Sequence, residues 1–241
     1  MKIFRDCNSP ETESAFRHEI KYGVTSSRAL SIKAALSPML LCDAHTNSDG
    51  GYLVKTLYFD TPDRSDYCDK ELGANVRQKL RLRTYGNSSE IFRLEMKRKE
   101  NDVSAKYSCL LDARDARALA SGDYSSLRES AESNADMLYA FLTMRGYRPL
   151  AVVTYYRYAY HAADRGFRMT FDTELRYDSD PCGLFRPTAF TGLAGDSAVI
   201  EVKYGDFLPE WITRELLQSG ISAGEFSKYG ISCARIFDLL F

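Results

Sequence analysis

Long hydrophobic runs are missing from this chain of 241 residues: no 18 consecutive residues are apolar. A transmembrane helix needs about 20 predominantly apolar residues, so no membrane segment is expected. The first residues (MKIFRD) also lack the apolar stretch of a secretory signal. We therefore expect a cytoplasmic protein.

Paired cysteines are missing as well. The six cysteines are scattered along the chain, with no C-x-x-C pair and no spacing typical of zinc ligands. In a cytoplasmic protein such cysteines are reduced thiols, so we expect neither disulfides nor a zinc site.

Charge of one sign is not in excess, because 32 Lys and Arg residues balance 33 Asp and Glu residues. A net charge of −1 argues against a general nucleic-acid binder, and no nucleic-acid partner is expected. A P-loop and a G-x-G-x-x-G motif are also absent. Any anion site must therefore be local and made by sorting charge within the fold.

Alternating apolar and polar residues predict an α+β protein of about eight antiparallel strands. Residues 1–14 are polar and predict a flexible arm, and 15–241 predict a single domain. We expect strands over 16–22, 52–59, 77–83, 91–99, 103–111, 151–160, 167–174 and 198–204. We expect helices over 25–41, over most of 112–146, from Pro209 onward and over 226–241.

The segment 77–83 (RQKLRLR) has the most informative pattern. A period of two places Arg77, Lys79, Arg81 and Arg83 on one face of a strand. Same-face side chains in a strand lie about 6.5–7 Å apart, so these cations repel one another unless water or an anion screens them. A solvated strand face is the ordinary interpretation of one such segment.

At least five predicted strands repeat this alternation of charged and apolar residues. Because the helices need an apolar surface to pack on, we expect a closed antiparallel barrel, a tunnel, with helices outside and charged residues inside. An empty interior rich in Arg and Lys is destabilising, which favours a polyanion as its ligand. Glutamates among phosphates favour binding of Mg²⁺ or Mn²⁺.

More ordinary roles stay open for several of these residues. Glu95 and Glu174 can equally neutralise neighbouring cations, and Arg168 with Asp172 can equally form a structural pair. The 16 tyrosines suit packing in a β-rich domain, and histidines near strands are more often structural than catalytic.

Nine short blocks, in order over about 16–238, resemble one family. They are RHEIKY (17–22), LYFD (57–60), KLRLR (79–83) with YG (85–86), LEMK (94–97), SAK (104–106), YYR (155–157), 168–175 ending in DTEL, VIEVK (199–203) and FSKY (226–229). The sequence thus resembles the catalytic domain of VTC-type polyphosphate polymerases, within the triphosphate tunnel metalloenzyme superfamily.

The resemblance implies a metal-dependent phosphotransferase that binds ATP and moves its γ-phosphoryl group onto a growing inorganic polyphosphate chain. It implies that phosphates are gripped by Lys21, Arg81, Arg83, Lys97, Arg157 and Lys203. Substrate contacts are assigned to Arg77, Lys79, Lys106, Tyr155, Arg168, Ser227 and Lys228. It implies Glu201 as the ligand of Mn²⁺ or Mg²⁺, with Glu19 and Glu95 as helpers.

Two departures from the family pattern qualify the resemblance. This chain shows neither the regulatory domain nor the membrane helices joined to this domain in eukaryotic complexes, so it resembles a stand-alone prokaryotic version. Arg17 also occupies the first position of the Glu-x-Glu-x-Lys motif of hydrolytic members, which disfavours a hydrolase. A polymerase leads, and a tunnel-fold triphosphate hydrolase and a non-catalytic polyphosphate-binding module remain as alternatives.

Overall fold

The computed structural model describes residues 18–43, 50–86, 90–101, 103–163, 166–186, 192–193, 196–224 and 226–238. The predicted arm, residues 1–14, and Arg17 lie outside the described residues.

The chain groups into two compact units. Unit 1 comprises Met1–Tyr52, Tyr156–Leu175 and Gly195–Phe226, and unit 2 comprises Leu53–Tyr155, Arg176–Ala194 and Ser227–Phe241. Each unit has its own hydrophobic core: that of unit 1 includes the buried side chains of Phe171 and Ile200, and that of unit 2 includes Leu82. The prediction of one domain over 15–241 stays a prediction.

In the described part of the chain, ten strands form the β structure. They are β1 (His18–Thr25), β2 (Leu41–Cys42), β3 (Tyr52–Asp60), β4 (Val76–Tyr85), β5 (Ile91–Glu100), β6 (Val103–Asp112), β7 (Arg148–His161), β8 (Phe167–Asp178), β9 (Gly192–Leu193) and β10 (Ser197–Tyr204). Neighbouring strands follow the order β1-β10-β8-β7-β3-β4-β5-β6, with β2 on β7 and β9 on β8. The pairs β1–β10, β10–β8, β3–β4, β4–β5 and β5–β6 are antiparallel, as expected.

The predicted closed barrel is wrong. Within the described ranges the strand order begins at β1 and ends at β6, and these two strands do not pair with each other, so the sheet is open. Alternating charge requires only that each strand has one apolar and one charged face, and an open sheet meets that requirement. Closure depends on pairing between the first and last strands, which alternation does not report.

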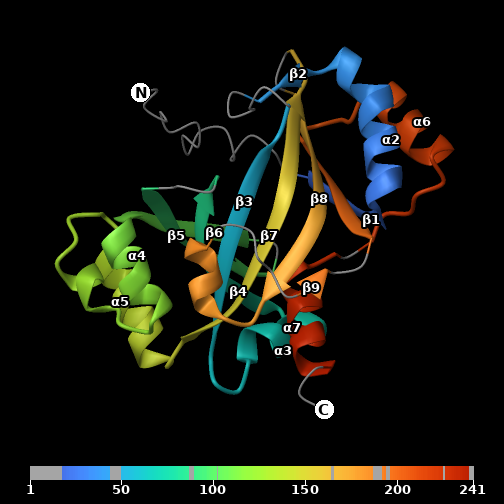
Figure 1. Cartoon of the computed structure of the whole chain (residues 1–241). Helices are drawn as coiled ribbons and strands as arrows, with labels where there is room; N and C mark the ends of the chain where they lie inside the picture. The colour runs from blue at the N-terminus through green and yellow to red at the C-terminus, as the bar shows by residue number, and fades with distance from the viewer. Residues whose placement is uncertain are drawn as a thin grey trace. The chain divides into compact units, whose positions relative to one another are not determined.

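Helices cover the apolar faces. They are α2 (Ser26–Leu36), α3 (Ser65–Glu71), α4 (Ala113–Ala120), α5 (Ala135–Met144), α6 (Glu210–Gln218) and α7 (Lys228–Asp238), with the short 3₁₀ helices η1 (Ser37–Met39), η2 (Ser125–Arg128) and η3 (Pro181–Phe185). In unit 1, α2 packs on β1, β10 and α6, and in unit 2, α4 packs on β5 and β6 while α3 packs on β4 and α7 (Figure 1). None of the described helices is long and apolar enough to cross a membrane.

The helices differ from the sequence predictions mainly at their ends. The helix expected over 25–41 begins as predicted, since Thr25 caps it by accepting a hydrogen bond from the Arg28 amide. It ends at Leu36, because Pro38 belongs to the following 3₁₀ turn and cannot continue an α-helical ladder. Helix α3 was not predicted, and its seven residues are too few to show a clear helical period.

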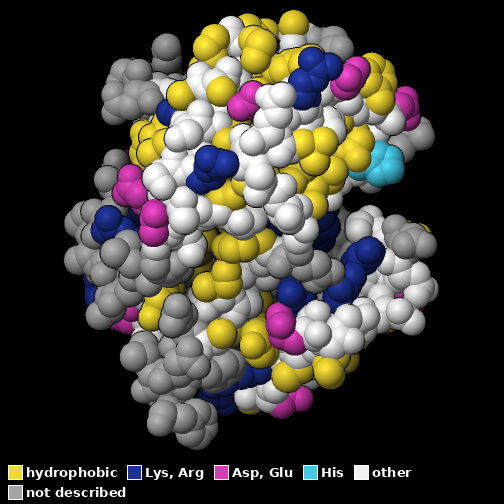
Figure 2. All heavy atoms as spheres, turned by 90° about the vertical axis from the view of Figure 1, so that its right-hand side faces the viewer, with side chains coloured by type: hydrophobic (Ala, Val, Ile, Leu, Met, Phe, Trp, Pro, Cys, Tyr) yellow, Lys and Arg dark blue, Asp and Glu magenta, His cyan; other side chains and the backbone are white. Residues whose placement is uncertain are grey.

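Basic and acidic side chains are interspersed on the face drawn in Figure 2, without a broad field of one sign. This distribution agrees with the net charge of −1. Positive charge is concentrated instead along particular strands, above all β4.

A buried polar cluster in unit 2 joins α3 to β4. The Tyr147 hydroxyl donates to the Asp66 carboxyl at 2.8 Å and accepts from the Gln78 amide at 2.9 Å. Burial raises the pKa of Asp66 to about 7; the hydrogen bond from Tyr147 opposes this shift, and the nearby carboxyl of Asp60 adds to it. The folded protein therefore holds a proton on Asp66 at pH values where the unfolded chain has released it.

The contribution of Asp66 to the stability of the protein should consequently fall as pH rises from about 4 to 7. In that window the folded state binds one more proton at Asp66 than the unfolded state, which costs up to about 1.4 kcal/mol per pH unit. Asp66→Asn should remove this contribution and flatten the dependence, whereas Asp136→Asn, an exposed carboxyl in α5, should leave it unchanged. Urea unfolding at pH 4.5 and 7.0 measures the difference, and equal slopes for wild type and Asp66→Asn would contradict it.

Candidate functional site

The alternation predicted for 77–83 is confirmed in β4. Gln78, Leu80 and Leu82 are buried, whereas the four basic side chains between and beside them are half-buried. These four continue across β5 and β6, because residues directly opposite in a sheet share one face. We call this surface of unit 2 the cationic face; it comprises Arg77, Lys79, Arg81 and Arg83 on β4, Arg93, Glu95, Lys97 and Lys99 on β5, and Lys106 on β6.

Like charges stand directly opposite each other on the cationic face. Of its four pairs between β4 and β5, three join two cations: Arg77–Lys99, Lys79–Lys97 and Arg83–Arg93. Lys97 is in turn opposite Lys106 on β6, so three lysines form one row across three strands. Directly opposed like charges destabilise a sheet, and a bound polyanion would relieve that repulsion.

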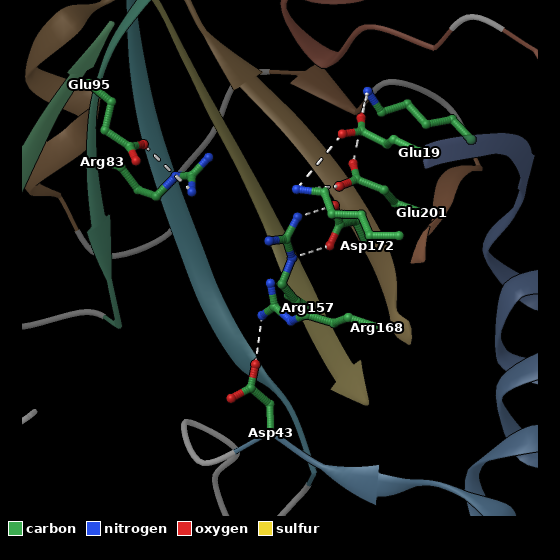
Figure 3. Close-up of polar contacts among 10 residues, drawn as sticks. Glu19, Asp43, Arg83, Glu95, Arg157, Arg168, Asp172 and Glu201 are labelled. Carbon is green, nitrogen blue, oxygen red and sulfur yellow. Dashed lines mark hydrogen bonds and ion pairs between the residues drawn. The ribbon is translucent and has the colours of Figure 1, made fainter. Parts of the chain in front are cut away.

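Glu95 is the one acidic residue among these cations. Its carboxylate is only 2% exposed and lies 2.8 Å from Arg81 Nε, 3.7 Å from Arg83 Nη1 and 3.0 Å from Lys106 Nζ. Burial alone would raise its pKa, but Arg81, Arg83 and Lys106 outweigh burial and hold the pKa well below the ordinary value. Figure 3 shows Glu95 directed toward Arg83.

The start of α7 also contributes to this part of unit 2. Ser227 accepts a hydrogen bond from Lys79 Nζ at 3.0 Å and, as the cap of α7, another from the Gly230 amide at 3.1 Å. The Lys228 ammonium lies over the Tyr155 ring, 4.8 Å from its centre. Ser227 and Lys228 therefore lie beside Lys79 and Tyr155, and their substrate-binding role stays a prediction.

Unit 1 carries a second group of charges with a different pattern. Glu19 and Lys21 on β1 stand opposite Lys203 and Glu201 on β10, so unlike charges face each other. We call these four residues the mixed-charge cluster. Lys21 lies 2.5 Å from Glu19, and Lys203 lies 3.5 Å from Glu201 and 3.8 Å from Glu19 (Figure 3).

The two carboxylates of the mixed-charge cluster influence each other. Burial and the charge of Glu201 both act to raise the pKa of Glu19. The ammonium groups of Lys21 and Lys203 outweigh them, so the pKa of Glu19 lies below its ordinary value. The two lysines therefore keep the Glu19 carboxylate ionised at neutral pH.

The remaining predicted residues of unit 1 are held by aspartates. Arg157 makes a bidentate pair with Asp172, with nitrogen–oxygen distances of 2.6 and 2.7 Å, and Asp172 is fully buried. Arg168 donates instead to Asp43 at 2.6 Å (Figure 3). The sequence-based pairing of Arg168 with Asp172 is thus replaced by two other pairs.

The mixed-charge cluster fits a hard divalent cation only as a partial site. The described residues contain no group of three or more His, Cys, Asp or Glu side chains placed to hold a metal. Mg²⁺ and Mn²⁺ commonly take one or two carboxylates and fill the remaining positions with water and substrate phosphate, which Glu19 and Glu201 can satisfy. Glu95 is a poorer candidate, because three cations surround it.

One residue near these carboxylates was not singled out from the sequence. Thr170 stands directly opposite Glu201, and its buried hydroxyl has no hydrogen-bond partner among the described residues. A buried hydroxyl without a partner is costly, so it supports a ligand oxygen or water beside Glu201. Its place between Arg168 and Asp172 in the alternation of β8 is the signal that could have found it.

Known structures resemble this fold. A putative adenylate cyclase from Bacillus halodurans is similar with a TM-score of 0.54 and 15% identity, over 87% of this chain and 92% of that one. A putative adenylyl cyclase from Hippeastrum, described as having a dominant triphosphatase activity, is similar with a TM-score of 0.52 and 17% identity, over 90% of this chain and 96% of that one. At these identities the similarity concerns the fold alone.

Sequence comparison identifies the family. No curated protein matches the chain significantly. The model of the VTC domain matches residues 16–237, which span nearly the whole sequence and include all nine blocks from which the resemblance was drawn. The chain therefore belongs to the VTC domain family, as its strand motifs indicated.

Proposed function

We propose that this protein is a polyphosphate polymerase that transfers the γ-phosphoryl group of ATP to an inorganic polyphosphate chain. The observation that supports this most is the set of directly opposed cations on the cationic face, in a chain of the VTC domain family. Such repulsion destabilises the sheet, and a bound polyanion would offset it.

The residues of unit 2 have distinct parts in this proposal. Phosphoryl transfer depends on in-line positioning and on stabilising charge on the transferring oxygens. We assign contacts with phosphate oxygens to Arg81, Arg83 and Lys97. Successive residues on the same face of a strand, such as Arg81 and Arg83, lie about 6.5–7 Å apart. The substrate contacts assigned around them are those of Arg77, Lys79, Lys106, Tyr155, Ser227 and Lys228.

In unit 1 we assign phosphate contacts to Lys21 and Lys203 and cation binding to Glu201 and Glu19. A bound Mg²⁺ or Mn²⁺ would neutralise phosphate oxygens and orient them. Two nitrogens of Arg157 donate to Asp172. We therefore assign Arg157 a structural role in unit 1 rather than direct contact with substrate. We propose no Ser, Cys or His nucleophile, since the terminal phosphate of the acceptor chain can attack directly.

A triphosphate hydrolase is the second candidate. The observation that favours it is the fold similarity to the Hippeastrum protein with a dominant triphosphatase activity. The two reactions share the binding of a triphosphate and differ in whether phosphate or water accepts the phosphoryl group.

Incubation of the purified protein with ATP and Mn²⁺ or Mg²⁺ tests these candidates. A polymerase gives ADP and long polyphosphate, and a hydrolase gives orthophosphate without polymer. Binding of inorganic triphosphate without turnover would instead indicate a non-catalytic polyphosphate-binding module and would refute the proposed activity.

Glu201→Gln should lower the rate of this turnover by about 100-fold or more, because a neutral amide binds a hard divalent cation much more weakly than a carboxylate. Steady-state rates over a range of Mn²⁺ concentrations measure the effect. Glu210→Gln is the matched control, since its exposed side chain pairs only with Arg214 on α6 in the described structure. Equal rates and equal metal dependence for Glu201→Gln and wild type would remove Glu201 from the site.

A further inference from the structure

The place of Ser227 and Lys228 depends on how α7 is attached to the rest of unit 2. Both residues are at the start of α7, which is not part of any strand. The contacts of this helix with β3 and α3 therefore determine where the two side chains lie relative to Lys79 and Tyr155.

Asp60, the last residue of β3, is the polar centre of these contacts. Its buried carboxyl accepts hydrogen bonds from the backbone amides of Thr61 at 2.8 Å, Asp66 at 3.1 Å and Tyr67 at 3.1 Å. These bonds fix the beginning of α3 to the end of β3.

Tyr229 attaches α7 to the same carboxyl. Its hydroxyl donates to Asp60 Oδ2, and its ring lies 5.0 Å from that of Tyr58 and 6.4 Å from that of Tyr67. Burial, with added effects from Cys233 and Asp60, raises the pKa of Tyr229, so the hydroxyl remains a donor at physiological pH. Tyr229 is 2% exposed and follows Lys228 directly.

The two helices also approach each other closely beside this bond. Gly230 is next to Tyr229, and a Cβ atom at this position would lie 3.3 Å from Glu71 of α3 and 3.3 Å from the Ser227 side chain. A side chain at position 230 would therefore crowd both Glu71 and Ser227, and glycine avoids this.

We infer that Asp60 and Tyr229 are a positioning pair that holds Ser227 and Lys228 in place for phosphate binding. The inference rests on the proposed function, since it concerns the phosphate-binding role of Ser227 and Lys228. In this inference neither Asp60 nor Tyr229 contacts the ligand. The carboxyl of Asp60 joins β3, α3 and α7, and Tyr229 thereby fixes the position of the two residues before it.

Tyr229→Phe tests the pair, because it removes one hydroxyl and keeps the ring contacts. We expect it to weaken the binding of inorganic triphosphate about tenfold, because the lost hydrogen bond to Asp60 no longer fixes the start of α7, where Ser227 and Lys228 lie. Tyr124→Phe is the matched control; it removes another buried hydroxyl of unit 2, which donates to the Tyr147 carbonyl at 2.7 Å. Both variants should lower the melting temperature, but only Tyr229→Phe should change the dissociation constant in calorimetric titration.

A double-mutant cycle separates positioning from general loosening of the fold. In a background with Ser227→Gly and Lys228→Ala, Tyr229→Phe should alter triphosphate binding by less than about twofold. Glycine is chosen at 227 because it is tolerated as a helix cap. Asp60→Asn, which keeps the size of the side chain, should weaken binding like Tyr229→Phe and provides a second variant if one of them does not fold.

The outcomes distinguish the two proposals. Wild-type protein that neither binds triphosphate nor turns over ATP refutes the proposed function. Wild-type protein that binds triphosphate and forms polyphosphate from ATP, with Tyr229→Phe binding triphosphate as tightly as Tyr124→Phe, refutes only the positioning pair. An undiminished effect of Tyr229→Phe in the Ser227→Gly, Lys228→Ala background also overturns it.

Discussion

Replacing Arg83 by alanine is expected to lower polyphosphate formation from ATP by about 100-fold or more, as the loss of one charge-stabilising donor does in other enzymes. Arg83 stands opposite Arg93, and its side chain is 11% exposed, so water screens its charge only weakly. The guanidinium can contact two phosphate oxygens at once, which alanine cannot replace. Rates of ADP and polymer formation at saturating ATP measure the effect.

Arg98→Ala is the control for this experiment. Arg98 lies on β5 but outside the cationic face, and its side chain is 44% exposed beside Glu100 at 3.4 Å. It should retain the wild-type rate. If Arg83→Ala is correctly folded by circular dichroism and keeps wild-type turnover, the cationic face is not the site of the reaction.

Glu95→Gln is expected to lower the free energy of unfolding by about 3 kcal/mol at pH 7, in the range found when one partner of a buried ion pair is removed. The substitution keeps the shape of the side chain but removes the negative charge that faces Arg81, Arg83 and Lys106. Those cations would then repel one another without a counter-charge. Urea unfolding measures the loss.

An added anion should distinguish this origin of the instability from a packing defect. Inorganic triphosphate should raise the melting temperature of Glu95→Gln more than that of wild type, because it supplies the missing negative charge. Glu100→Gln, on the same strand but 58% exposed, should stay within about 0.5 kcal/mol of wild type. Equal stability of Glu95→Gln and wild type would show that the carboxylate does not hold the cationic face together.

The faces of the strands could be predicted from the sequence because they depend on local alternation. The pattern RQKLRLR already separates Leu80 and Leu82 from the basic residues, and the burial of β4 follows it. The hairpin between β4 and β5 also aligns Arg81 with Glu95. Burial faces and near-neighbour register are thus determined within a few residues of chain.

The other contacts of the site depend on long-range packing. Arg157 pairs with Asp172 and Arg168 with Asp43, and nothing in the spacing of these residues chooses those partners. Helix α3 is similar, since its first turn is held by Asp60 at the end of β3. The prediction of a closed barrel was wrong for the same reason, since closure depends on whether the two outermost strands pair.

An open sheet leaves β1 and β6 as edge strands in the described part of the chain. Unpaired backbone groups along such edges are templates for intermolecular β-pairing and aggregation. Charged side chains on both strands, Glu19 and Lys21 on β1 and Lys106 on β6, place charge where another strand would add. The charges assigned to phosphate and cation binding therefore also help to keep separate copies of the chain from joining edge to edge.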